Sequence, residues 1–170
     1  MNRRFGVFAF GAMVLLGAPG AANAQIKGYV GLGGGVSMPL GDFKDEVKLG
    51  WLVQGTAGFT TKTIIGARAD VTYGQHKSKA TGGGTGKILG FMGDVVVSPK
   101  MAGKVGAYIL AGAGMQNLKA EGSSETKFAW NAGAGLRAGM IYLEARFVSV
   151  KHDGGTTNFV PITVGVRFPK

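Results

Sequence analysis

The sequence predicts an all-β fold, an eight-stranded antiparallel up-and-down transmembrane β-barrel. Three observations support this prediction. Apolar residues alternate with small or polar residues in eight successive segments. The charged residues of these segments share the face opposite the apolar one. The chain also begins with the features of an export signal.

The composition fits one exported, folded domain. The chain has 170 residues, of which 45% are hydrophobic and 16% are charged, and this balance excludes an intrinsically disordered chain. It contains 32 glycines without a Gly-X-Y period, so it is not collagen-like. The absence of cysteine excludes disulfide scaffolds, cysteine zinc sites and thiol nucleophiles. We expect no cofactor and no metal site.

The first element is an export signal, expected over residues 1–24. A basic stretch, Asn2 to Arg4, precedes an apolar run from Phe5 to Ala18, and Ala22-Asn23-Ala24 follows as a cleavage site. The apolar run is shorter than the roughly 18 residues that a membrane-spanning helix needs. We therefore expect cleavage after Ala24, a barrel over residues 25–170 and a location in the outer membrane. The net charge of +10 then indicates anionic lipid rather than nucleic acid as the partner.

Eight segments carry the alternation that predicts strands. In the last of them, Ile162, Val164 and Val166 alternate with Thr163 and Gly165, which places the two sets on opposite faces. Each segment reaches the roughly 9–11 residues of a tilted membrane strand. The expected strands span residues 27–38, 48–60, 63–75, 87–98, 104–117, 126–138, 140–151 and 157–168.

The connections between these strands alternate in length. Short turns are expected at 61–62, 99–103 and 139, and longer polar loops at 39–47, 76–86, 118–125 and 152–156. An even number of strands with this alternation is typical of an outer-membrane barrel. Both termini and the short turns then lie on the periplasmic side, and four loops lie outside the cell.

The charged face of the strands is expected to point into the lumen. An arginine that faces the bilayer midplane costs about 2–4 kcal/mol, whereas a soluble ligand-binding barrel would have an apolar lumen instead. Buried charges must be paired, and an eight-stranded lumen is only wide enough for side chains. We expect inward glycines to make room for an ion-pair network that plugs the lumen, formed by Arg68, Asp70, Asp94, Arg137, Glu144, Arg146 and Arg167.

Aromatic residues on the apolar face predict two girdles at the membrane interfaces. Trp51 and Phe59 lie on one face of one expected strand, about 26 Å apart along it at ~3.3 Å per residue. Trp51 belongs to the outer girdle and Phe59 to the inner one. The complete expected sets are Trp51, Tyr73, Phe91, Phe128 and Trp130 outside, with Phe59 and Phe168 inside.

Two segments carry a resemblance to a known family. The run Pro39-Leu40-Gly41-Asp42-Phe43 after the first strand and the ending Ile162 to Phe168 resemble those of small outer-membrane β-barrels of Gram-negative bacteria, the OmpA-like and OmpX-like proteins. The resemblance implies insertion by the barrel-assembly machinery, which reads the last strand and its terminal aromatic residue. Phe168 resembles that aromatic residue.

The leading functional prediction is a non-enzymatic structural or surface-interaction protein. Its outer loops would contact lipopolysaccharide, or a ligand on a host or neighbouring cell surface. Lys77 and Lys79 could meet lipid phosphates. Two alternatives stay open: a narrow ion-conducting pore, and a lipid-modifying enzyme that uses His76 or His152 with a serine near the rim.

Overall fold

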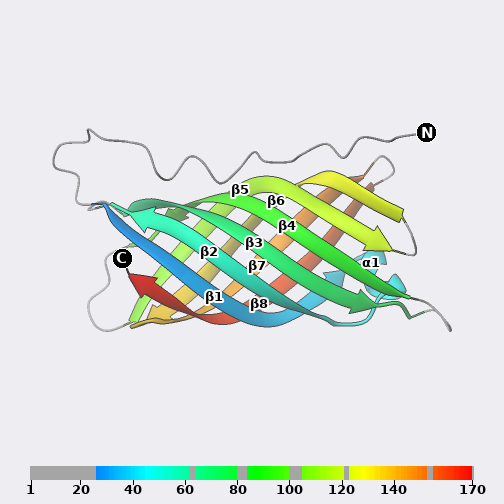
Figure 1. Cartoon of the computed structure of the whole chain (residues 1–170), viewed down its shortest axis with the longest axis horizontal. Helices are drawn as coiled ribbons and strands as arrows, with labels where there is room; N and C mark the ends of the chain where they lie inside the picture. Colours follow the sequence, from blue (N-terminus) through cyan, green and yellow to red (C-terminus); the bar gives the residue numbers. More distant parts are fainter. Residues whose placement is uncertain are drawn as a thin grey trace, which may run out of the picture.

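The computed structural model describes residues 26–61, 64–79, 84–99, 105–120, 123–152 and 155–169. Eight strands form a closed barrel, and one short helix lies at one of its ends (Figure 1). The expected export signal, residues 1–24, lies outside the described residues. The elements are β1 (Lys27–Leu40), α1 (Asp42–Glu46), β2 (Gly50–Thr60), β3 (Ile65–Lys77), β4 (Thr85–Val97), β5 (Val105–Ala120), β6 (Ser123–Ala138), β7 (Ile141–His152) and β8 (Gly155–Pro169).

Each strand pairs antiparallel with its neighbours along the chain, and β1 closes the barrel by pairing with β8. The start of β1 and the end of β8 lie at one end of the barrel, and α1 lies at the other (Figure 1). The predicted fold is therefore confirmed. Within the described residues, the helical structure is too short to cross a membrane.

Two of the expected outer loops are largely strand. β5 continues to Ala120, which pairs with Ser123, and β7 continues to His152, which pairs with Gly155. The amide of Asn117 donates to the Thr126 hydroxyl at 2.9 Å across the β5–β6 hairpin. The alternation of apolar and polar residues fades here because most side chains of these hairpin ends are polar, apart from Leu118, so it could not mark the ends of the strands.

The loop expected at 39–47 contains α1, which the sequence did not predict. This loop is tied to the β3–β4 loop by backbone hydrogen bonds. The Lys48 N–H donates to the Lys77 carbonyl at 2.8 Å, and the Lys79 N–H donates to the Glu46 carbonyl at 2.8 Å. The half-buried Phe43 of α1 packs against apolar side chains of the lumen. The described parts of the first two outer loops are therefore linked to each other at the mouth of the barrel.

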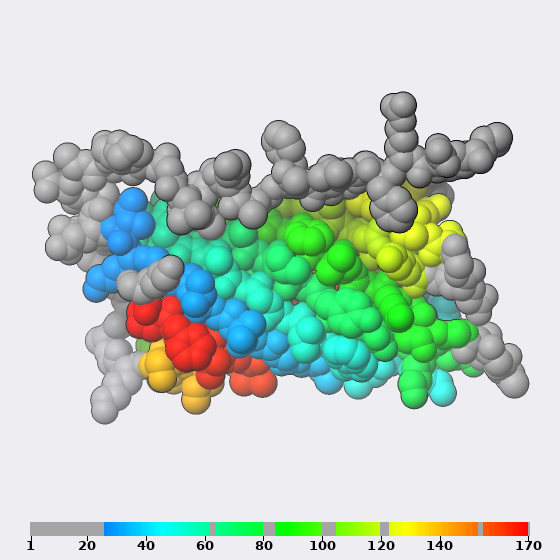
Figure 2. Space-filling view, viewed as in Figure 1, coloured from blue at the N-terminus to red at the C-terminus, as the bar shows by residue number. Residues whose placement is uncertain are grey.

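The barrel is apolar outside and charged inside. Leu32, Ile109 and Leu143 point outward with 66%, 57% and 50% of their surface exposed, whereas Asp70 and Glu144 are 2% and 1% exposed. Side chains of β1 to β4 cover one face of this outer surface in oblique bands (Figure 2). A soluble barrel would reverse this distribution, so the outer surface is suited to lipid.

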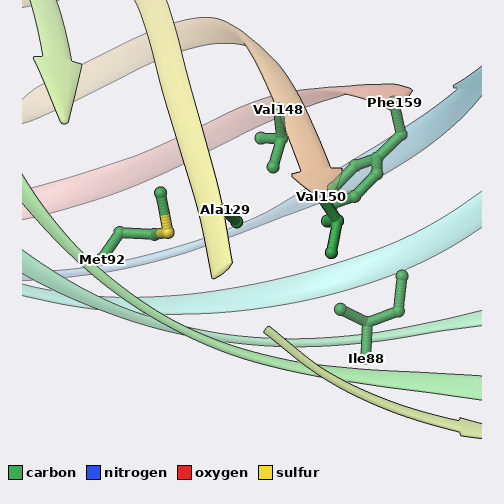
Figure 3. Packing of buried hydrophobic residues seen from close by; sticks show 6 residues of the cluster. All are labelled: Ile88, Met92, Ala129, Val148, Val150 and Phe159. Carbon is green, nitrogen blue, oxygen red and sulfur yellow. The ribbon is translucent and has the colours of Figure 1, made fainter. Parts of the chain in front are cut away.

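The lumen is filled at three levels along the barrel axis. Three buried tyrosines lie near the end of the barrel where β1 begins and β8 ends, which is the expected periplasmic end, and charged residues lie in the middle. Near the outer end of the barrel the lumen contains a cluster of apolar side chains. The sequence analysis missed this cluster, although its residues occupy the inward-facing positions of their strands. This apolar cluster contains Ile88, Met92, Ala129, Val148, Val150 and Phe159 (Figure 3).

Candidate functional site: a buried ion-pair network below an outer recess

Arg68 on β3 is one of two arginines in the middle of the lumen. Its Nε lies 3.0 Å from Asp70 Oδ2, and its Nη1 lies 2.8 Å from Glu144 Oε2 on β7. Its Nη2 is 3.8 Å from Asp94 Oδ2 on β4. The alternation along each strand turns these side chains inward, and the barrel brings strands distant in sequence across from one another.

Arg146 on β7 is the second arginine and reaches the same three carboxylates. Its Nη2 lies 2.8 Å from Asp70 Oδ2, its Nη1 lies 3.2 Å from Asp94 Oδ2, and its Nε pairs with Glu144. Both arginine side chains are only 5% exposed. The middle of the lumen therefore contains a network in which two guanidinium groups share three carboxylates.

Neutral donors complete the hydrogen bonding of these carboxylates. The Asn131 amide donates to Asp94 Oδ1 at 2.7 Å, and the Tyr108 hydroxyl donates to Glu144 Oε2 at 2.8 Å. The Gln54 amide donates to Asp70 at 3.3 Å. The three acids exceed the two arginines by one formal charge, so these donors help to stabilise the excess negative charge.

Arg137 and Arg167 are placed apart from this network, which corrects the expectation of seven interlocked residues. Within the described residues neither forms an ion pair with a carboxylate. Both are half-buried at the periplasmic end, where the Arg167 guanidinium lies 3.2 Å from the centroid of the Tyr29 ring. The alternation along a strand predicts whether a side chain points into the lumen, but it does not predict its height along the barrel axis. Asp70, Asp94 and Glu144 all lie at the middle of the barrel, away from Arg137 and Arg167.

Three lumen tyrosines were not part of the predicted lumen set, although Tyr142 shares the inward face of Glu144 and Arg146 in the sequence pattern. A Cβ on Gly165 would lie 2.6 Å from the Tyr142 ring, and a Cβ on Gly135 would overlap the Tyr108 ring. These inward glycines therefore make room mainly for tyrosines rather than for arginines. The inward parity of Tyr29, Tyr108 and Tyr142 is the sequence signal that could have located them.

The seven expected girdle residues all lie on strand positions that face outward. Trp51 and Tyr73 lie with their ring centroids 5.8 Å apart on adjacent strands near the outer end. Phe59 and Phe168 each precede the last residue of their strands at the periplasmic end. The remaining three, Phe91, Phe128 and Trp130, are 53%, 51% and 45% exposed.

Lys77 and Lys79 lie at the outer end of the barrel with exposed side chains. The ammonium group of Lys79 donates to the Lys44 carbonyl at 2.6 Å. Lys44 and Lys48 belong to the loop that holds α1, so four lysines of two loops gather at one side of the mouth. Three acidic residues of the short helix α1, Asp42, Asp45 and Glu46, partly offset this positive charge. We refer to Lys44, Lys48, Lys77 and Lys79 as the lysine patch.

Both histidines belong to strands, His76 to β3 and His152 to β7, which corrects the expectation that residues 76 and 152 begin outer loops. His76 is an inward residue of β3 with only 2% of its surface exposed. Its Nδ1 lies 3.1 Å from the Lys48 carbonyl. His152 Nε2 lies 2.8 Å from the Thr157 hydroxyl. In the part of the chain that the structure describes, neither ring is hydrogen-bonded to a serine or a carboxylate. Asp153, the acidic residue that follows His152 in the sequence, lies outside that part.

A recess of about 490 Å³ opens at the outer end of the barrel. Its apolar wall contains Phe43, Ile88 and Leu118, with His76 beside them. Its rim carries charged and polar residues of both signs, namely Glu46, Lys87, Lys119, Glu125 and His152. A second cavity of about 30 Å³ lies deeper and is lined in part by Gln54, Gln116 and Asn131, together with His76, which also lines the recess. The ion-pair residue Arg146 also borders this deeper cavity.

Together, the apolar outer surface, the closed eight-stranded sheet and the charged lumen define a transmembrane β-barrel of the bacterial outer-membrane type. The sequence is consistent with this class. The chain belongs to the outer membrane protein beta-barrel domain family, whose profile matches residues 8–168. The protein is therefore an outer-membrane, cell-surface barrel. No curated protein sequence matches the chain significantly.

Several solved structures share the fold. Neisserial surface protein A, NspA, is 14% identical with a TM-score of 0.62, and the match covers 82% of this chain and 95% of that one. The attachment invasion locus protein Ail of Yersinia pestis, in complex with the heparin analogue sucrose octasulfate, is 16% identical with a TM-score of 0.52, covering 85% and 99%. The outer membrane enzyme PagL is 13% identical with a TM-score of 0.53, covering 82% and 98%.

Proposed function

We propose that this protein is a non-enzymatic surface-interaction barrel whose lumen is closed and whose outer end contacts molecules at the cell surface. The buried ion-pair network is the observation that carries the proposal. Five charged side chains, none more than 5% exposed, occupy the lumen at its middle level. A lumen filled in this way favours a plug over a pore, and it leaves the outer end as the part available for binding.

The hydrogen bonds of the two histidines favour a non-enzymatic role. A nucleophilic triad requires a base in contact with both a nucleophile and an orienting group. His76 bonds to a backbone carbonyl and His152 to a threonine hydroxyl. PagL shows that the fold can carry an enzyme, but its likeness to this chain concerns the fold alone.

We propose that assembly follows the route of other outer-membrane barrels. Residues 1–24 would direct export and be removed. The barrel-assembly machinery would recognise β8, in which the exposed Phe168 lies near the periplasmic end. The seven outward aromatic residues would lie at the two membrane interfaces, where aromatic side chains are favoured.

The lysine patch is proposed to bind the phosphate groups of lipopolysaccharide. Each exposed lysine near an anionic surface contributes about 1 kcal/mol. The hydrogen bonds between the two loops hold Lys77 and Lys79 at the mouth, so that little ordering is needed on binding. Ail, a barrel of the same fold, was crystallised with a heparin analogue, which shows that this fold can present a site for a polyanion.

Replacing Lys77 and Lys79 together with glutamate is expected to weaken binding to lipopolysaccharide vesicles about tenfold at low salt, because four units of charge change at the patch. The measurement is co-sedimentation with these vesicles of the protein held in lipid nanodiscs, so that its apolar outer surface does not itself drive the association. The matched control is the Lys87→Glu, Lys119→Glu double variant, which makes the same charge change at two exposed residues paired across β4 and β5. Unchanged affinity of the Lys77/Lys79 variant, or an equal loss in the control, would refute the assignment to the patch.

A further inference from the structure

We infer that the periplasmic mouth of the barrel binds a peptide segment that carries carboxylate groups, through the guanidinium groups of Arg137 and Arg167. This inference goes beyond the proposed function, because that function concerns the outer end and the filled lumen separates the two ends. Arg137 is the next-to-last residue of β6, and Arg167 lies two residues before the end of β8. Both residues therefore lie at the end of the barrel where β1 begins and β8 ends (Figure 1).

The periplasmic end carries positive charge that no acidic residue balances. Of the nine acidic residues in the sequence, three belong to the ion-pair network at the middle of the lumen. The other six belong to the outer connections or to the strand ends beside them, and they are Asp42, Asp45, Glu46, Glu121, Glu125 and Asp153. At the periplasmic end, Lys27 is exposed at the start of β1 and adds to the charge of the two arginines. Basic residues gathered at one mouth without acidic neighbours attract anions to that mouth.

Both guanidinium groups are accessible and free to bind a ligand. Among the described residues, neither Arg137 nor Arg167 forms an ion pair with a carboxylate. Each side chain is half-buried, and none of its nitrogen atoms is both fully buried and without a partner, so the N–H groups keep contact with water. That water enters from the periplasmic mouth, because the lumen at this end is filled by the buried rings of Tyr29, Tyr108 and Tyr142.

The two arginines are held in place by their surroundings. The guanidinium of Arg167 lies 3.2 Å from the centroid of the Tyr29 ring, and its backbone N–H donates to the Met140 carbonyl at 2.7 Å. A guanidinium stacked on a ring keeps its N–H donors at its edge, where an acceptor can meet them. Arg137 faces Gly106 across the β5–β6 pair, and a Cβ on that glycine would lie 3.9 Å from its Nη2. Both groups are therefore positioned before a ligand arrives, which lowers the entropy cost of binding.

The geometry of the two groups favours several carboxylates on one peptide. A planar guanidinium binds a carboxylate through two parallel N–H bonds. β6 and β8 both pair with β7, so the two arginines start from strands about 10 Å apart. Arg137 extends toward Gly106 on β5 and Arg167 toward Tyr29 on β1, on opposite sides of the barrel. Alternate side chains of an extended peptide, about 7 Å apart, can reach both sides, whereas one carboxylate cannot.

Lipid phosphates are a poorer match for this site. Arg137 and Arg167 occupy inward positions of their strands, whereas phospholipid head groups surround the outside of the barrel wall. The outward residue next to Arg167 is the exposed Phe168, which suits the lipid interface instead. A periplasmic peptide can approach the mouth along the barrel axis without crossing the wall.

The test uses the peptide Glu-Ala-Glu-Ala-Glu, with both termini blocked and a neutral fluorophore attached. Its matched control is Gln-Ala-Gln-Ala-Gln, which has nearly the same shape and no charge. The full barrel is held in nanodiscs of phosphatidylcholine, which has no net charge, and fluorescence anisotropy measures binding. We expect a Kd on the order of 100 μM for the glutamate peptide at about 50 mM salt, and binding at least about tenfold weaker for the glutamine peptide.

Variants at the two ends of the barrel locate the site. The Arg137→Gln, Arg167→Gln double variant should weaken binding of the glutamate peptide about tenfold or more. The control, Lys87→Gln with Lys119→Gln, removes the same charge at the outer end and should leave the affinity unchanged. Replacing both arginines with glutamate should reverse the preference, so that this variant binds Lys-Ala-Lys-Ala-Lys instead. The mobility of unboiled samples on SDS gels checks that each variant remains a folded barrel.

Three outcomes would overturn the inference: equal affinity for the glutamate and glutamine peptides, unchanged affinity in the Arg137/Arg167 glutamine variant, or an equal loss in the outer-end control. These outcomes are separate from a failure of the proposed function. The arginine variants leave the lysine patch and the ion-pair network in place, so binding to lipopolysaccharide and the absence of conductance are expected to remain. Failure of peptide binding therefore rejects the periplasmic site and not the surface-binding role.

Discussion

Replacing Arg146 with alanine is expected to lower the free energy of unfolding by about 3–5 kcal/mol, the usual cost of removing one partner of a buried ion pair. Arg146 contacts Asp70, Asp94 and Glu144, and its loss leaves three buried carboxylates with Arg68 as their remaining guanidinium partner. Urea titration of the refolded protein in lipid vesicles, followed by tryptophan fluorescence, measures the change.

The matched control for this prediction is Arg137→Ala. Arg137 also points inward from its strand, but it is half-buried and forms no ion pair with a carboxylate among the described residues. We expect its replacement to change the free energy of unfolding by less than about 1 kcal/mol. Equal effects of the two substitutions would contradict the conclusion that five residues, rather than seven, form the network.

Replacing Gly112 with alanine is expected to cost about 3 kcal/mol or more. A Cβ on this inward glycine of β5 would overlap Asp94 Oδ1 and the Gly93 carbonyl oxygen. Because a backbone atom is one of the overlapping groups, a change of side-chain rotamer cannot relieve the clash, and the β4–β5 pairing must shift. The displacement of Asp94 would also disturb its contacts with Arg146 and Asn131.

Gly93→Ala is the matched control, one register position away on the facing strand. Gly93 points outward, and the nearest atom to an added Cβ is the Ala113 carbonyl oxygen at 3.9 Å, an ordinary contact. We expect a change within about 1 kcal/mol, measured by the same urea titration. A small effect at Gly112 would mean that the lumen at this level is looser than the structure indicates.

Alternation predicted the middle of every strand because lipid and lumen impose opposite demands on the two faces there. The same demands placed Arg68 and Glu144 inside and Leu143 outside. At the outer end of the β5–β6 hairpin most side chains are polar, apart from Leu118 and Ala120, so the extension of β5 to Ala120 could not be predicted. The periodic pattern also carried no signal for the five residues of α1, because a single helical turn is too short to show a period.

The sequence predicted which residues of the site point into the lumen, but it did not predict which of them contact one another. Parity assigned Arg137 and Arg167 to the lumen, but the axial level that separates them from Asp70 depends on the shear of the barrel. His76 lies near the end of β3. An error of one or two residues in the predicted strand end is enough there to place it in a loop rather than in the lumen. Its contact with the Lys48 carbonyl depends on the packing of one outer loop against another.

Single-channel recording of the refolded wild-type protein in a planar lipid bilayer tests the central claim, the closed lumen, most directly. The buried network of Arg68, Arg146 and their three carboxylates predicts no steady conductance at ordinary potentials. The Arg146→Ala variant serves as the comparison. If this variant conducts ions and the wild type does not, the ion-pair network is the barrier to ion flow. A steady conductance of the wild type that changes with Arg146→Ala would contradict the closed lumen and establish a narrow pore instead.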